Sequence, residues 1–170
     1  MADHELIAAA QALLDLCRQK KLKIATAESC TGGLLAATLT EIPGSSDVLD
    51  RGFVTYSNEA KQAMLGVSAT TLDSFGAVSR ETAEAMARGA LDHAPVDLSA
   101  SVTGIAGPGG GSPAKPVGLV HFAAGARGGG LIYQERRFGD IGRALVRRAS
   151  VLQALAMLRE LAQNEAPKPP

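Results

Sequence analysis

The segment Glu28–Gly33 places a hydroxyl, a thiol and a second hydroxyl directly before two glycines. We expect a helix to begin here, and the free amides and positive dipole end of a helix start favour an oxyanion or a phosphate. Ser29 is therefore a candidate nucleophile, with Thr31, Gly32 and Gly33 as candidate binding groups. Ser29 or Thr31 fits a simple helix cap equally well, and the residues alone leave both interpretations open.

Cys30 competes with Ser29 for the role of nucleophile, because a thiol near a helix start has a lowered pKa. A small buried residue is the commoner role of such a cysteine. Cys17 lies on the apolar face of a predicted helix. With an adequate core and no export signal expected, both cysteines are interpreted as free thiols.

A serine nucleophile needs a base, and Lys61 is the candidate. On the first turn of a predicted helix its ammonium faces the positive dipole end, and this effect and burial both lower its pKa. Tyr56, at the end of the preceding strand, offers a further hydroxyl. The ordinary role of a lysine such as Lys61 is that of a solvated surface residue, and a strand tyrosine such as Tyr56 usually serves packing. The three histidines are scattered, so neither a Ser-His-Asp arrangement nor a metal site is predicted.

A second glycine-rich segment, residues 103–111, begins at Thr103. Its glycines let backbone amides approach an anion, which makes Gly107, Gly109 and Gly110 candidate phosphate-binding residues. No Gly-Lys-Ser or Gly-Lys-Thr follows, so the segment is not a Walker motif. Nearby prolines prevent a helix from starting at these glycines, so it is not a dinucleotide fingerprint either. Lys115 is either a further anion-binding group or an exposed loop lysine.

Strands and helices alternate along the chain and place these segments at strand ends. Apolar periodicity and capping residues predict helices over residues 4–20, 34–38, 59–65, 80–93 and 141–161. β-Branched and aromatic residues predict strands over 23–26, 52–56 and 98–103, and a closing hairpin of 117–124 with 131–138. This order predicts an α/β fold with a mixed sheet, in which sites gather at the carboxyl ends of the strands.

The last predicted helix has an apolar surface that is too wide for one core face. We therefore expect a homodimer or a higher homo-oligomer. Residues 1–163 are expected to form a single domain. Residues 164–170, which include three prolines, are expected to be a disordered tail.

Length and composition exclude several classes of protein. The chain has 170 residues, with 17 Lys and Arg against 17 Asp and Glu, 4% aromatic residues and no Trp. Zero net charge and scarce aromatics argue against a nucleic-acid partner. No apolar run approaches the roughly 18 residues that span a bilayer, so we expect a cytoplasmic protein without a membrane partner.

Seven motifs in the same order, over nearly the whole chain, resemble the CinA C-terminal domain family. They are Thr26–Gly33, Pro43–Ser46, Gly52–Asn58 with Lys61, Leu65–Val67, Gly76–Ser79, Thr103–Pro108 and Lys115–Gly118. The resemblance implies a three-layer α/β/α sandwich and, commonly, a dimer. It also implies nicotinamide-nucleotide amidase activity, in which water converts nicotinamide mononucleotide to nicotinate mononucleotide and ammonia without a metal or organic cofactor.

Position by position, the resemblance implies that Ser29 is the nucleophile, Lys61 the base, and Tyr56 and Thr103 supporting hydroxyls. Cys30 is placed among the substrate-binding residues. The alternative function is a non-catalytic nucleotide-binding module.

The chain departs from the family pattern near its C-terminal end. The segment Phe138–Arg143 carries one extra residue and breaks the Asp-Arg pair of the family. Arg143 is still a candidate for binding the substrate phosphate. Arg147 lies four residues later, and we interpret it as an exposed helix arginine.

Overall fold

The computed structural model describes residues 3–170, which form six α-helices and five strands. The helices are α1 (His4–Lys20), α2 (Leu34–Thr40), α3 (Asn58–Leu65), α4 (Ala69–Phe75), α5 (Arg80–Asp92) and α6 (Arg143–Asn164). The strands are β1 (Ile24–Glu28), β2 (Leu49–Val54), β3 (Leu98–Gly104), β4 (Leu119–Ala126) and β5 (Leu131–Arg137), and a short 3-10 helix, Ser45–Asp47, precedes β2.

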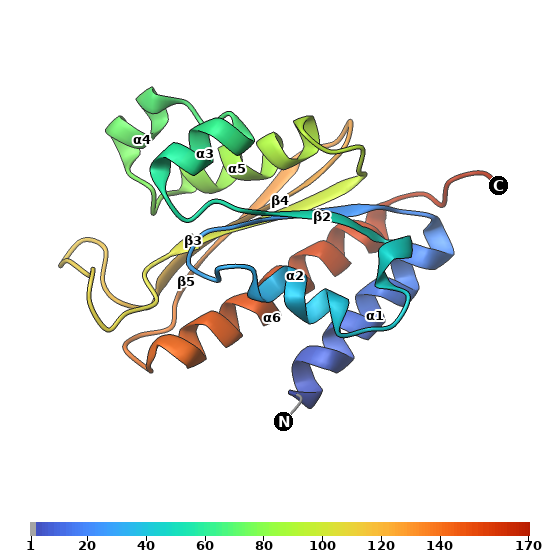
Figure 1. The fold of residues 1–170 in the computed structure, drawn as a ribbon, viewed down its shortest axis with the longest axis horizontal. Coiled ribbons are helices and arrows are strands. Elements are labelled where there is room, and N and C mark those ends of the chain that lie inside the picture. Colours follow the sequence, from blue (N-terminus) through green and yellow to red (C-terminus); the bar gives the residue numbers. More distant parts are fainter. Residues whose placement is uncertain (1–2) are drawn as a thin grey trace.

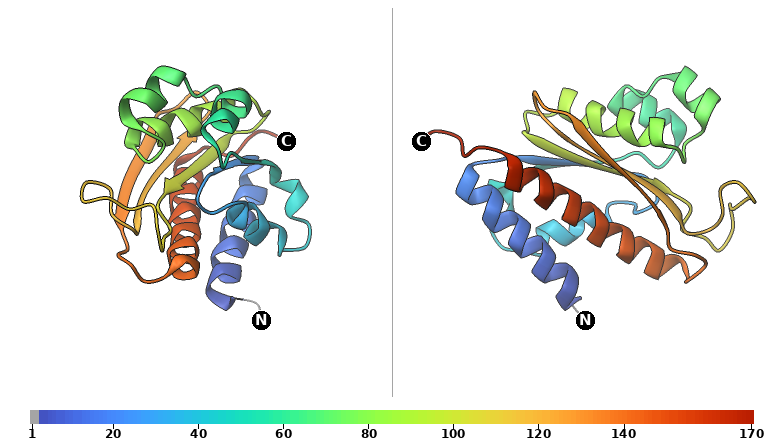
Figure 2. Two further views of the ribbon diagram at one scale, coloured as in Figure 1. Left: turned by 60° about the vertical axis from the view of Figure 1, so that its left-hand side comes forward. Right: turned by 180° about the vertical axis from the view of Figure 1, so that it is seen from behind.

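These elements form three layers (Figures 1 and 2). The sheet in the middle has the strand order β2-β1-β3-β4-β5. Helices α1, α2 and α6 cover one face, and α3, α4 and α5 cover the other. The predicted three-layer α/β/α sandwich with a mixed sheet is confirmed.

The register of the three parallel strands determines where the site lies. Strand β1 pairs in parallel with both β2 and β3, and Glu28 is level with Val54 and Val102. The antiparallel hairpin β4–β5 completes the sheet next to β3. Because parallel strands end at the same edge, the residues that follow β1, β2 and β3 come together there.

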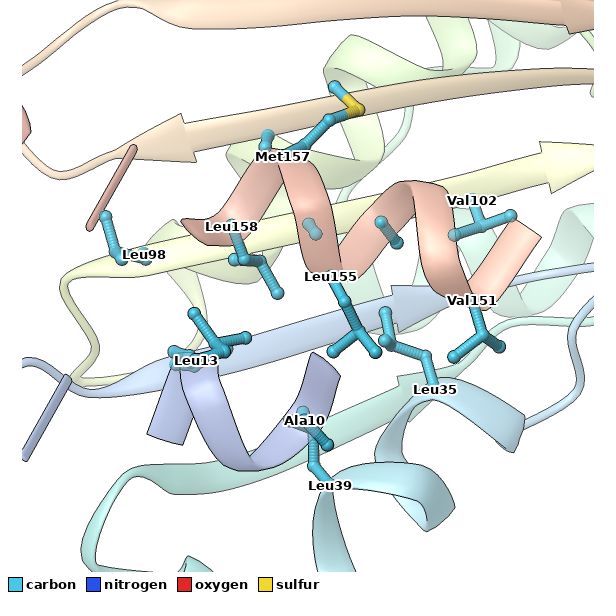
Figure 3. Close-up of a cluster of buried hydrophobic side chains, with 14 of the residues drawn as sticks. Ala10, Leu13, Leu35, Leu39, Leu98, Val102, Val151, Leu155, Met157 and Leu158 are labelled. Carbon is cyan, nitrogen blue, oxygen red and sulfur yellow. The ribbon is translucent and has the colours of Figure 1, made fainter. Parts of the chain in front are cut away.

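The core beneath this edge is apolar and fully buried (Figure 3). Leu35 of α2, Val102 of β3 and Val151 of α6 have no exposed surface, and neither do Leu13 of α1 and Leu98 at the other end of β3. In Figure 3 the side chains of Leu35 and Val151 lie close together below β3. This packing holds α2 and α6 against the strand that leads into the glycine-rich loop.

Two elements differ from the sequence-based expectation. The second strand covers Leu49–Val54 rather than 52–56, because pairing with β1 sets its ends. Beyond it, the amide of Thr55 still donates to Glu28 O at 2.8 Å, while Tyr56 lies outside the sheet. Helix α4 was not expected, since Leu72 is its one buried residue and gives no periodic pattern.

Helix α6 buries most of its apolar surface within the domain. Val146, Val151 and Leu155 are buried, whereas the side chain of Leu145 is 53% exposed. After α6, the amide of Lys168 donates to Lys20 O at 3.0 Å, and its ammonium lies 2.5 Å from an Asp97 carboxylate oxygen. The disorder expected for residues 164–170 stays a prediction.

Candidate active site

A cavity of about 280 Å³ opens at the carboxyl edge of the parallel strands. Helix α6 begins at this end of the molecule, and the loop after β3 extends beyond the sheet there (Figures 1 and 2). Its lining residues come from the turns after β1, β2 and β3, from α3 and from the start of α6: Ser29, Cys30, Tyr56, Asn58, Lys61, Ala77, Val78, Thr103, Gly104, Ile105, Ala106, Gly107, Gly109, Gly110 and Arg143.

Ser29 and Lys61 meet inside this cavity. Ser57 caps α3 by accepting a hydrogen bond from Ala60 N at 3.0 Å, and this cap places Lys61 on the first turn of the helix. The Lys61 side chain is 1% exposed, and its Nζ lies 3.0 Å from Ser29 Oγ and donates to Thr55 O at 2.9 Å. Burial lowers the pKa of the Lys61 ammonium. A neutral amine next to a hydroxyl is the arrangement that general-base catalysis requires.

Cys30 lines the same cavity but differs from the sequence-based expectation. Its side chain is buried, and burial raises the pKa of the thiol to about 12, with the charges of Lys61 and Arg147 acting in the opposite direction. The expected lowering by the helix start is therefore wrong, because desolvation of the thiolate outweighs it.

The start of α2 is occupied by a carboxylate of the protein itself. Glu28 is fully buried, and its two carboxylate oxygens accept hydrogen bonds from Leu35 N at 2.8 Å and Ala36 N at 3.0 Å. We had expected this helix start to bind an external anion through Thr31, Gly32 and Gly33, whereas its first-turn amides bind a carboxylate of the same chain. The sequence missed this cap because Glu28 belongs to the preceding strand, and its side chain reaches the helix across the turn.

The other predicted groups of this turn also lie outside the cavity lining. Gly32 N donates to Ser29 O at 3.0 Å, which holds the turn closed. Thr31 is buried, and its Oγ1 has no hydrogen-bond partner within residues 3–170. Neither Thr31 nor Gly32 and Gly33 are among the residues that line the cavity.

Tyr56 and Thr103 both line the cavity. Thr103 is buried, and its Oγ1 donates to Ala77 O at 2.6 Å. Tyr56 is 60% exposed, and its hydroxyl accepts a hydrogen bond from Arg143 Nη2 at 2.9 Å. Arg143 Nη1 also donates to Gly107 O at 3.0 Å, so one guanidinium joins Tyr56 to the glycine-rich loop.

The three predicted glycines of the glycine-rich loop, Gly107, Gly109 and Gly110, all line the cavity. At Gly107 a side chain has no room, since a Cβ would lie 2.6 Å from Val117 Cγ1 and φ is +81°. Lys115, which follows this loop, lies elsewhere: its Nζ donates to Phe75 O at 2.7 Å, and it lines a separate cleft.

Two further residues differ from the sequence-based expectation. Asn58, which was not among the predicted site residues, begins α3 and lines the cavity, and its place in the turn between β2 and α3 is the signal that could have found it. Arg147 is half-buried and donates to Thr31 O at 2.8 Å, so the exposed role expected for it is wrong. That contact joins residues 116 positions apart, which no local pattern predicts.

Residues 3–170 contain neither a cluster of metal-binding side chains nor a membrane-spanning helix. No group of three or more His, Cys, Asp or Glu side chains in this range is arranged to hold a metal ion. No helix within the same range has the length and apolar character needed to cross a membrane.

Comparison with families and curated proteins gives the following matches. The model of the family described as the CinA C-terminal domain matches residues 7–162. A protein named nicotinamide-nucleotide amidohydrolase PncC from Shigella flexneri is 47% identical over 166 residues, which cover 96% of this chain and 99% of that protein. A putative competence-damage inducible protein from Caldicellulosiruptor bescii is 47% identical over 150 residues, and the match spans 88% of this chain but 36% of that longer protein.

Solved structures match over nearly the whole chain. A competence/damage inducible protein from Agrobacterium tumefaciens is similar with a TM-score of 0.93 and 53% sequence identity, covering 97% of this chain and 99% of that one. A CinA superfamily protein from Escherichia coli has a TM-score of 0.87 and 35% identity, covering 95% of this chain and 93% of that one.

Proposed function

The chain belongs to the CinA C-terminal domain family, and from this membership we propose that it is a nicotinamide-nucleotide amidohydrolase. The proposed substrate is nicotinamide mononucleotide, which water converts to nicotinate mononucleotide and ammonia. The full-length similarity to a PncC amidohydrolase supports this substrate class. The observation that carries the proposal is the 3.0 Å approach of the buried Lys61 Nζ to Ser29 Oγ inside a cavity.

In the first half of the proposed reaction, Ser29 Oγ attacks the carboxamide carbon while its proton passes to the neutral Lys61 amine. The N–H donated to Thr55 O, 2.9 Å away, orients that amine so that its lone pair faces Ser29. The tetrahedral intermediate then collapses and its C–N bond breaks. Lys61 returns the proton to the leaving nitrogen, and ammonia departs from a nicotinoyl ester of Ser29.

In the second half, a water molecule attacks the ester carbonyl and gives a proton to Lys61. The C–O bond to Ser29 breaks, and Lys61 protonates the departing Oγ, which restores the starting serine. The nicotinate group leaves as a carboxylate, and ammonia takes up its proton. One lysine thus serves as base and acid in both halves.

A backbone amide is suited to stabilise the oxyanion of these intermediates. The amide of Gly32 is already bonded to Ser29 O, and Thr31 does not line the cavity, so we assign this role to the amide of Cys30 in the same turn. The hydroxyls of Tyr56 and Thr103 are assigned supporting roles at the cavity wall.

The substrate phosphate is assigned to the mouth of the cavity. Gly107, Gly109 and Gly110 expose their backbone there, and Arg143 adds a guanidinium. A planar guanidinium recognises phosphate by two parallel hydrogen bonds, so Arg143 is the strongest single phosphate ligand in this assignment.

We further propose a homodimer that acts in the cytoplasm. The start of α6 exposes Leu145 by 53%, and Ile141 just before it by 46%. Such neighbouring apolar side chains are commonly covered by a second copy of the same chain.

Ammonia release from nicotinamide mononucleotide by the purified protein tests the activity directly. We expect turnover that Ser29→Ala abolishes while the substrate still binds. Binding of the mononucleotide without ammonia release by the unmodified protein would instead support a non-catalytic nucleotide-binding module. Neither binding nor turnover would contradict the proposed substrate.

A further inference from the structure

Arg147 joins the last helix to the turn that carries Ser29. It lies on the second turn of α6, and its Nη2 donates to Thr31 O at 2.8 Å. A Cβ added to Gly32 would lie 3.7 Å from the same nitrogen, so the guanidinium packs against the backbone of that glycine. Arg147 is not among the residues that line the cavity, and it reaches Ser29 only through this turn.

The guanidinium of Arg147 forms no ion pair within residues 3–170. No carboxylate in this range lies within 4.0 Å of it, whereas the neighbouring Arg148 pairs with Asp3 and Glu5. In the same range, the Nε of Arg147 is buried without a hydrogen-bond partner. Partial burial of a cation without an ion pair costs free energy of folding, so an ion pair does not explain this arginine.

One peptide group connects Arg147 to the nucleophile. Arg147 binds the oxygen of the peptide between Thr31 and Gly32, and the N–H of that peptide donates to Ser29 O at 3.0 Å. A cation on the oxygen polarises the group and strengthens the N–H as a donor. The amide of Ser29 itself donates to Val102 O at 2.9 Å, so Ser29 is held from both sides.

The charge of Arg147 also acts on this turn. It favours the thiolate of Cys30, the neighbour of Ser29, although burial has the larger and opposite effect on the pKa of that thiol. A positive charge this close stabilises negative charge that develops next to Cys30 during attack by the serine.

We propose that Arg147 is a positioning residue for amide hydrolysis. It holds the 29–33 turn in the arrangement that presents Ser29 Oγ to Lys61 and the amide of Cys30 to the cavity. The inference rests on the proposed function, and its test therefore includes a measurement that needs no nicotinamide substrate.

The test compares Arg147→Met and Arg147→Lys with Arg148→Met, a matched change at the next residue that removes ion pairs away from the cavity. Four quantities are measured: kcat and KM for ammonia release, the labelling rate of Ser29 by a fluorophosphonate probe, and the thermal midpoint. For Arg147→Met we expect kcat and the labelling rate to fall between about 10- and 100-fold, and KM to stay within about threefold. Arg147→Lys should recover part of both rates, and Arg148→Met should change neither.

The thermal midpoint separates positioning from folding. Arg147→Met should lower it no more than Arg148→Met does, because the half-buried guanidinium that is removed has no ion pair within residues 3–170, whereas Arg148→Met removes two. Wild-type rates in Arg147→Met, or losses that follow the thermal midpoint across the three variants, would overturn the inference. If the unmodified protein releases no ammonia but Ser29 is labelled, the proposed substrate fails and the labelling rates still decide the role of Arg147. If Ser29 is not labelled either, both proposals fall.

Discussion

Burial changes the chemistry of Lys61 and of Cys30 in opposite directions. Desolvation lowers the pKa of the Lys61 ammonium and raises the pKa of the Cys30 thiol to about 12. The same environment therefore disfavours both the ammonium and the thiolate. This contrast supports the serine hydroxyl beside Lys61, rather than the thiol, as the nucleophile that we propose.

The assignment of Ser29 as nucleophile and Lys61 as base predicts how activity is lost in single and double variants. Ser29→Ala and Lys61→Met should each lower kcat by on the order of a thousandfold or more, since a serine hydroxyl is a weak nucleophile without its base. The double variant should lose scarcely more, because the two residues act as a unit. Steady-state ammonia release measures this, with Cys30→Ala as the control that keeps most activity. An inactive Cys30→Ala together with an active Ser29→Ala would identify the thiol as the nucleophile.

The lowered pKa of Lys61 predicts the direction of the pH dependence. The proposed base is the neutral amine, so kcat/KM should fall as the pH decreases and Lys61 gains its proton. Because burial lowers that pKa, the midpoint of this limb should lie below the usual lysine value of about 10.4. A pH profile of kcat/KM measures it. A profile that stays flat down to the range where carboxylates titrate would remove Lys61 as the base, even if its variant is inactive.

At the scale of elements, α2 is held to β1 by the Glu28 carboxylate. Glu28→Gln replaces one acceptor oxygen with a donor that faces a helix amide, which costs about 1–3 kcal/mol for a buried unpaired group. At about 2–4 °C per kcal/mol for a chain of this size, we expect the thermal midpoint to fall by roughly 2–12 °C. Calorimetry measures this change. Glu41→Gln is the control, since Glu41 is exposed at the other end of α2, and equal midpoints for both variants would contradict the role of Glu28.

The glycine-rich loop and the start of α6 together predict a preference for the phosphorylated substrate. Nicotinamide riboside should have a kcat/KM at least about tenfold below that of the mononucleotide, because charge-assisted hydrogen bonds are lost. Arg143→Gln should reduce the ratio of the kcat/KM for the mononucleotide to that for the riboside. Lys115→Gln should leave it unchanged, since that ammonium is bound to Phe75 O. Equal turnover of both compounds by the unmodified protein would contradict a phosphate site at this mouth.

Local sequence patterns predicted the elements better than the contacts between them. The serine cap of α3 is a local signal, and it correctly placed Lys61 on the first turn of that helix. The contacts of Glu28, Lys115 and Arg147 depend on which distant backbone lies beside each side chain. No spacing along the chain carries that information, so their interpretation required the structure. The shift of the second strand has the same cause, because its pairing with β1 set its ends.

At the scale of the whole molecule, the exposed apolar residues at the start of α6 predict a dimer. Light scattering at micromolar concentration should give the mass of two chains or more. Leu145→Glu should shift this mass towards one chain without lowering the thermal midpoint of the monomer, because the side chain is 53% exposed within the domain. Phe75→Glu, on α4 at the other face of the sheet, is the control. A strictly monomeric unmodified protein would contradict the prediction.

The residues around the cavity come from segments spread over most of the chain. Ser29 follows β1, Thr103 lies at the end of β3, and Arg143 and Arg147 belong to α6, which follows all five strands along the chain. Under the proposed function, we therefore expect a nascent chain to be inactive after its strands are made and to gain activity when α6 docks against the sheet. Recovery of ammonia release during refolding would consequently report the time at which the fold is complete.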